Sequence, residues 1–264
     1  MVVDKVQISR AFLLGGEDLP IDDKLTVKHP KVGEILNLGN KVWCDIFYWN
    51  YVFTFACDPY DHMVYLDKQG INYQNITSYE LFIRKYEDLT LHPDEKKDEL
   101  VIMLSAIKFW LGEHIFDIAD KDDGTKVLVD INDPKVYIDS SRFAAISAFI
   151  QMINCIGNRD DKINPANETA RRILIEDMEA AQNRRRRSKE INDNDNLGDI
   201  ISGVISGGNG GINALNFKDA PIYAITSNMT SIQKKMNYDK LLTGVYVGTI
   251  KAKELNNKQI SWMK

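Results

Sequence analysis

The chain has 264 residues, of which 44% are hydrophobic and 27% are charged. This composition is typical of a globular protein with a packed core, and the length suggests one sizeable body with a smaller satellite. The formal net charge of -5 argues against a protein whose whole surface binds nucleic acid or another polyanion.

The three cysteines lie far apart and without CxxC spacing, as expected of reduced thiols in a cytosolic protein. The first residues lack the charged lead and apolar run of a secretory signal. No stretch approaches the ~18 consecutive apolar residues that a membrane span requires. We therefore expect a soluble, cytoplasmic protein without a membrane partner.

A β-rich start is expected over residues 1–40. Lys5 to Leu14 is a strand candidate, and Leu25 to Pro30 alternates apolar and polar side chains as a half-buried strand does. Val32 to Gly39 then resembles a short helix that ends at a glycine able to adopt left-handed dihedral angles.

The segment from Trp43 to Cys57 (WCDIFYWNYVFTFAC) is the most aromatic of the chain. Because each large aromatic ring removes ~150–250 Å² from water when it is buried, we expect this segment to contribute mainly to the core. The alternative is an apolar groove for a partner, whose contact residues would be Trp43, Phe47, Trp49 and Phe53.

Two helices are expected after the aromatic segment. A capping box of Thr77 and Glu80 opens one over residues 78–87. His92 to Glu95 opens the second, in which apolar residues recur every three or four positions. The residues expected on its buried face are Leu100, Leu104, Ile107, Leu111, Ile115 and Ile118.

A hairpin and two further helices complete the predicted body. Val127 to Ile131 and Val136 to Ile138 are the strands of the hairpin. Asp139 to Ser141 caps a helix over 143–156, and Asn164-Pro165 begins one that runs to residue 187.

The stretch after this last helix is expected to separate the body (1–187) from a small helical module (217–264). Residues 188–216 are polar and then glycine-rich, so we predict a flexible linker. An amphipathic helix within it stays open, and its apolar residues would be Leu197, Ile200, Ile201, Val204 and Ile205. The module should contain two short helices, one to Lys235 and one from Tyr238 to Val247, and its small size predicts docking on the body or on a partner.

An arginine block ends the body, and it consists of Arg184, Arg185, Arg186 and Arg187. Consecutive residues point around the whole circumference of a helix, and three aspartates follow within residues 193–199. A solvated helix end is therefore favoured over an acidic protein partner, and both are favoured over nucleic acid. Trp262, in the C-terminal module, is a further candidate partner contact.

We find no catalytic, metal or cofactor motif. Gly207 to Gly211 lacks the Lys-Ser or Lys-Thr of a phosphate-binding loop, and Asp120 to Gly124 does not fit a calcium loop. The four histidines lack zinc spacing, and no GxSxG is present. Asp58, Asp61 and His62 come nearest to a catalytic or metal cluster, although an ordinary turn explains them as well. We expect no cofactor, no metal and no enzymatic activity.

Scattered segments of the chain carry a resemblance to a known class of proteins. They are 25–35 (LTVKHPKVGEI), 57–59 (CDP), 65–73 (YLDKQGINY), 238–242 (YDKLL), 248–253 (GTIKAK) and 260–263 (ISWM). Together they resemble the tail assembly chaperones of Gram-positive long-tailed, siphovirus- or myovirus-like bacteriophages.

The resemblance implies a non-enzymatic protein that escorts the apolar tape-measure protein before the tail tube polymerises, and that is absent from the finished virion. Its partners would be the tape-measure protein and the major tail protein, with self-association left open and no nucleic acid bound. No site residues carry over from the class. The alternatives are a structural tail component, such as a tube or tail-completion protein, and then a nucleic-acid-processing enzyme.

A long helical client would be held by its apolar face in a groove. The aromatic segment, or the face of the helix over 100–118, is the part of the chain that could supply it.

Overall fold

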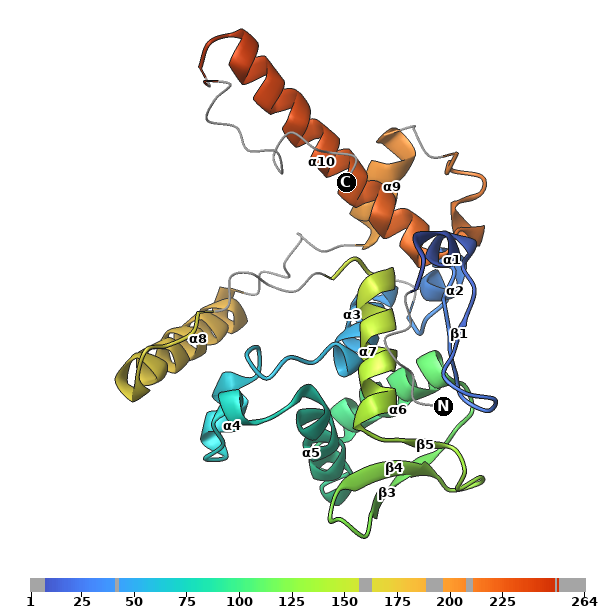
Figure 1. Ribbon diagram of the computed structural model, residues 1–264, viewed down its shortest axis with the longest axis vertical. Coiled ribbons are helices and arrows are strands. Elements are labelled where there is room, and N and C mark those ends of the chain that lie inside the picture. Colours follow the sequence, from blue (N-terminus) through green and yellow to red (C-terminus); the bar gives the residue numbers. More distant parts are fainter. Residues whose placement is uncertain are drawn as a thin grey trace.

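A computed structural model describes residues 8–40, 43–156, 163–188, 197–207, 211–249 and 251. Helices dominate these residues, and two small antiparallel sheets accompany them (Figure 1). The predicted class, α+β with a mainly helical body, is therefore confirmed. Trp262 lies outside the described residues.

The elements follow one another along the chain with short connections. They are α1 (Arg10–Gly15), β1 (Leu19–Pro20), β2 (Thr26–Val27), α2 (Val32–Leu36), α3 (Cys44–Phe55), α4 (Met63–Lys68), η1 (Tyr73–Asn75), α5 (Ser78–Leu91), α6 (Lys97–Leu111), β3 (Phe116–Asp120), β4 (Lys126–Asp130), β5 (Tyr137–Ile138), α7 (Ser140–Ile153), α8 (Glu168–Ser188), α9 (Leu197–Gly207), η3 (Phe217–Asp219) and α10 (Ile222–Tyr246).

The N-terminal segment contains less β-structure than expected. Residues 10–14 of the predicted first strand lie in helix α1 instead, because Ser9 Oγ accepts a hydrogen bond from the Phe12 amide and Gly16 ends the helix at φ 73°. These capping residues outweigh the strand-like composition. The β-structure is a two-residue pairing of β1 with β2, in which Leu19 lies opposite Val27. The predicted strand over 25–30 is thus reduced to Thr26–Val27.

Two helix starts in the body are confirmed by their capping bonds. Thr77 Oγ1 accepts from the Glu80 amide at 3.2 Å, and Glu80 Oε2 accepts from the Thr77 amide at 2.7 Å, so α5 begins at the predicted capping box. Asp139 Oδ1 accepts from the Arg142 amide at 3.0 Å and starts α7. Side-chain acceptors satisfy amides that a helix leaves unpaired at its first turn.

Helix α6 is shorter than the apolar repeat predicted. Gly112, with φ 85° and ψ -154°, ends it after Leu111. Ile115 and Ile118 therefore do not lie on its buried face, and Ile118 instead pairs with Leu128 between β3 and β4. Leu104 is exposed. The predicted hairpin of β4 and β5 is confirmed by the pairing of Leu128 with Ile138, and β3 adds a third strand.

The segment predicted to be a linker contains helix α9. Leu197, Ile201 and Val204 are buried on it. Residues 197–207 therefore form the amphipathic helix that was the alternative to a flexible linker. Glycines allow α9 to approach α10 closely, because a Cβ on Gly207 would lie 2.7 Å from Ile232 Cδ1. The domain boundaries at 187 and 217 stay predictions.

Helix α10 is continuous where two short helices were predicted, and its first turns dock on the body. The Val32 amide donates to the Ala220 carbonyl at 3.0 Å, and the Ile222 amide donates to the Pro30 carbonyl at 3.0 Å. Thr226 Oγ1 donates to the Ile153 carbonyl of α7 at 2.8 Å. Beyond these contacts α10 extends away from the body (Figure 1).

Candidate partner-binding site

Helix α3 uses its two faces differently. Tyr48, Val52 and Phe55 are fully buried in the core, whereas Trp43 and Phe53 on the opposite face are 42% and 52% exposed. The sequence prediction of a core segment therefore describes one face of the helix. The other face exposes Trp43 and Phe53, and their contact with a partner stays a prediction. We call the residues of the outer face the aromatic surface: Trp43, Ile46, Trp49 and Phe53.

The aromatic surface is carried by a firmly anchored helix. Tyr48 donates its hydroxyl hydrogen to Asn154 Oδ1 at 2.7 Å, and Trp110 Nε1 donates to the Tyr51 carbonyl at 3.0 Å. The rings of Trp49 and Phe53 stack with centroids 5.9 Å apart. Trp49 is half-buried against the core, and so is Phe47, the remaining contact residue predicted within α3. The surface is thus preorganised, which lowers the entropic cost of binding a partner.

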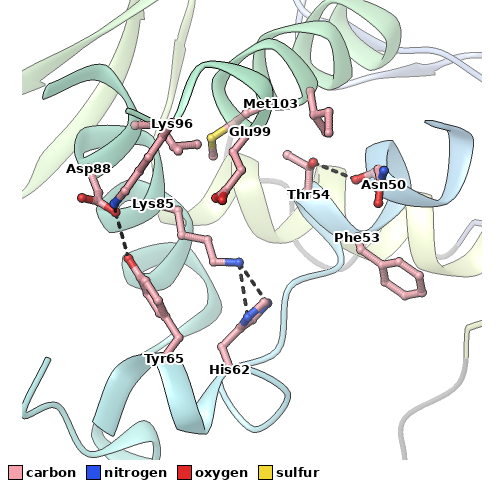
Figure 2. A pocket seen from close by; sticks show the side chains of 12 residues that line it. Asn50, Phe53, Thr54, His62, Tyr65, Lys85, Asp88, Lys96, Glu99 and Met103 are labelled. Carbon is pink, nitrogen blue, oxygen red and sulfur yellow. Dashed lines mark hydrogen bonds and ion pairs between the residues drawn. The ribbon is translucent and has the colours of Figure 1, made fainter. Parts of the chain in front are cut away.

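A cavity of about 600 Å³ opens beside Phe53, between α3, the start of α4, α5 and α6 (Figure 2). Of the predicted contact residues that the structure describes, only Phe53 lines it. Its apolar wall is formed by Phe53, Leu89, Ile102 and Met103, and its polar side by His62, Tyr65, Lys85, Asp88, Lys96 and Glu99. We call it the Lys85 cavity.

One group of polar side chains in the Lys85 cavity is internally paired. Asp88 forms an ion pair with Lys96 and accepts a hydrogen bond from the Tyr65 hydroxyl at 3.4 Å. The hydrogen bond from Lys96 lowers the pKa of Asp88 and raises that of Lys96. Both side chains therefore stay charged and satisfied around neutral pH.

Lys85 and His62 form the second polar group. The Lys85 ammonium lies 3.1 Å from Nε2 and 3.3 Å from Nδ1 of His62 (Figure 2). Burial lowers the pKa of Lys85, and burial together with this neighbouring ammonium lowers the pKa of His62 to about 4. His62 is therefore neutral near pH 7, so one ring nitrogen can accept a hydrogen from Lys85.

The predicted cluster of Asp58, Asp61 and His62 lies in a turn. The Tyr60 amide donates to Asp58 Oδ1 at 3.0 Å, and the Asp61 amide donates to the Asp58 carbonyl at 3.0 Å. Among the residues that the structure describes, no three His, Cys, Asp or Glu side chains gather as a metal site would need. A catalytic role of the cluster has no support from this geometry.

Arg184, the first residue of the arginine block, does not line the Lys85 cavity. Arg184 is exposed near the end of α8, a helix that packs on α4 and buries Ile175 (Figure 1). Lys68 of α4 forms an ion pair of 2.6 Å with Glu179 of α8. The side chains of Arg185, Arg186 and Arg187 lie outside the description.

Sequence reasoning missed the Lys85 cavity. Its residues come from four segments, which only the fold brings together. One local signal was present, because Lys85 stands three residues after Phe82 and four before Leu89, both of which are buried on α5. Because lysine is rarely fully buried, the ammonium group of a lysine at such a position on an apolar helix face is expected to lie in a cavity or against a partner.

Comparison with known proteins gives one match. Residues 188–264 match the family model described as the YomV second domain, a phage-derived domain, which points to a phage protein. No curated protein and no solved structure matches the chain. In the described part of the chain, no helix is both long and apolar enough to cross a membrane. The aromatic surface and the Lys85 cavity lie outside the matched segment.

Proposed function

We propose that this protein is a non-enzymatic phage tail assembly chaperone that binds the tape-measure protein in the host cytoplasm. The observation that carries the proposal is the aromatic surface, which exposes Trp43, Ile46 and Phe53 on a helix whose other face is locked into the core. Exposed large apolar side chains that recur on one face of a helix are typical of a binding surface.

The shape of the aromatic surface suits a helical client. Its residues recur three or four positions apart along α3, so they form a ridge that can pack into the groove of a second helix. The match of residues 188–264 to a phage-derived domain supports the phage setting. The resemblance to tail assembly chaperones supplies the identity of the client.

Co-expression with the tape-measure protein encoded nearby tests this function. We expect the client to become soluble and to co-purify as a complex. The double variant Trp43→Ala/Phe53→Ala should lose the complex, whereas Ile131→Ala, which removes an equally exposed apolar side chain elsewhere, should keep it. A client that stays insoluble with the wild-type chain would remove the main support for the proposal.

The exposed end of α10 favours a second candidate, a structural tail component. Met236, Tyr246 and Val247 are exposed there, and a protruding helix with apolar residues is suited to contacts between copies in an assembly. Immunoblotting of purified virions separates the two functions. A stoichiometric band in virions would favour the structural component, and its absence would favour the chaperone.

A further inference from the structure

The Lys85 ammonium has unused binding capacity. An ammonium group carries three hydrogen-bond donors, and in the described residues His62 is the acceptor for one of them. No ion pair joins Lys85 to a described carboxylate, although, against the larger effect of burial, Cys57 and then Glu99 act electrostatically to raise its pKa. Because a partly buried charge without a paired group is costly, a ligand that brings an acceptor with negative charge would stabilise this site.

Of the two lysines that line the Lys85 cavity, Lys85 is the one available to bind a negatively charged acceptor. Lys96 is paired with Asp88, which also accepts from Tyr65. Figure 2 shows Lys85 extending from α5 toward His62, apart from the Asp88–Lys96 pair. The Lys85 ammonium also lies over the Tyr65 ring, 5.9 Å from its centroid. The cavity thus offers a cation that has no carboxylate partner among the described residues, next to an apolar wall that includes Leu89 and Met103.

The number of charges selects the class of anion. Asp88 is paired with Lys96, so Lys85 and Glu99 are the remaining charges of the cavity lining. A dianionic phosphate would bring two negative charges to a single ammonium that already has one carboxylate in the same cavity. A carboxylate carries one charge, and it forms strong charge-assisted hydrogen bonds with an ammonium group. The adjoining apolar wall fits an aliphatic or aromatic group attached to that carboxylate.

We infer that the Lys85 cavity binds a carboxylate carried on an apolar body, with Lys85 as its charge partner. Phe53 lines this cavity and also belongs to the aromatic surface. Resting on the proposed function, the carboxylate is that of an Asp or Glu side chain on the client helix. A helix lying on the aromatic surface would then be fixed in register by this single polar contact.

The carboxylate site can be tested without the client. The probe is 3-phenylpropionate, and the neutral 3-phenylpropanamide is its isosteric control. Both are titrated into the full chain while NMR follows the imidazole ring of His62. We expect a saturable shift with the acid and affinity at least ~10-fold lower for the amide, because the amide lacks the charge. Equal affinity of acid and amide would overturn the inference.

Variants of α5 provide the matched comparison. Lys85→Met should reduce the affinity for 3-phenylpropionate at least ~10-fold, whereas Arg84→Met removes the same charge from an exposed position one residue away and should leave it unchanged. Circular dichroism verifies that both variants fold. Unchanged binding of 3-phenylpropionate by folded Lys85→Met would contradict the role of Lys85. If that variant does not fold, the comparison of acid with amide in the wild-type chain still tests whether the cavity binds a carboxylate.

The client complex separates this inference from the proposed function. Lys85→Met should weaken the complex ~10-fold without the loss expected of Trp43→Ala/Phe53→Ala. If the acid binds but the wild-type chain forms no complex, the chaperone function fails and the carboxylate site stands. If the complex forms and Lys85→Met leaves its affinity unchanged, the client is not the source of the carboxylate.

Discussion

Helices α5 and α7 of the body bury a larger share of their residues than helices α8 and α10 at its edge. Helices α5 and α7 are capped by side chains and bury a full face in the core. Among the described side chains of helix α8, which has 21 residues, Ile175 is the buried one. The buried residues of α10, which has 25 residues, all lie in its first turns, at 222–227. Secondary structure is thus a poor guide to where stability resides, because tertiary packing supplies most of the stability of a helix.

The largest difference should come from core truncation. Phe82→Ala removes a fully buried ring that stacks on Phe55 and packs at a tilt against Phe143, and we expect the free energy of unfolding to fall by about 3–5 kcal/mol. Met236→Ala on exposed α10 should change it by less than about 0.5 kcal/mol. Urea unfolding followed by circular dichroism measures both. Similar losses in the two variants would contradict the comparison.

Acid should weaken the body through its buried histidines. The folded state holds the pKa of His29 below its usual 6.5 and that of His62 at about 4, mainly by burial. The unfolded chain therefore binds more protons than the folded chain below pH ~6.5, so stability falls as pH drops through that value. From His62 we expect a loss on the order of 2 kcal/mol by pH 4.5.

Urea unfolding at pH 7 and at pH 4.5 measures this loss. The variants His29→Leu and His62→Leu each remove one titrating group and should each reduce the difference between the two pH values. His29 is the sharper case, because both of its ring nitrogens are buried and unpaired within the described structure. A pH dependence identical to the wild type in both variants would show that other groups cause the loss.

The attachment of α10 can be loosened at a single hydroxyl. Thr226→Val removes the bond to the Ile153 carbonyl and leaves that acceptor without its partner among the described residues, at an expected cost of about 1–2 kcal/mol. Thr230→Val is the control, because its hydroxyl bonds only within α10 in the described structure. Hydrogen exchange of residues 222–230 should speed up in the first variant and stay near the wild-type rate in the second.

The smallest change in stability is expected from loss of the capping hydrogen bond at the start of α7. Asp139→Ala removes the acceptor at the start of α7 and should cost about 1 kcal/mol. Asp139→Asn keeps a capping oxygen, so its unfolding midpoint should stay close to the wild type. If the Asn variant loses as much stability as the Ala variant, the charge of Asp139 matters more than its capping bond.

Features that neighbouring residues encode were predictable from the sequence. Thr77 with Glu80, and Asp139 before its helix, specify helix starts through contacts three residues apart. Strand composition misled at residues 10–14, where Ser9 and Gly16 cap a helix instead. The apolar repeat also continued past Gly112, although the backbone of that glycine ends α6.

The candidate site was predictable only in part. The residues of the aromatic surface lie within one segment, so the groove alternative already contained Trp43 and Phe53. The Lys85 cavity depends on the approach of α5 to the start of α4, which places Lys85 beside His62 across 23 positions of sequence. Such a contact requires the tertiary fold, and no local pattern encodes it.

The bridge between Lys31 and Pro221 also sets an order of events during synthesis. Residues 30–32 form backbone hydrogen bonds with residues 220–222. Helix α2 therefore cannot form these contacts until the ribosome has translated residues 220–222. Until then the side of α2 that contacts η3 stays uncovered. Contacts between such distant residues slow folding, and the N-terminal segment is therefore among the last parts of the nascent protein to reach its final packing.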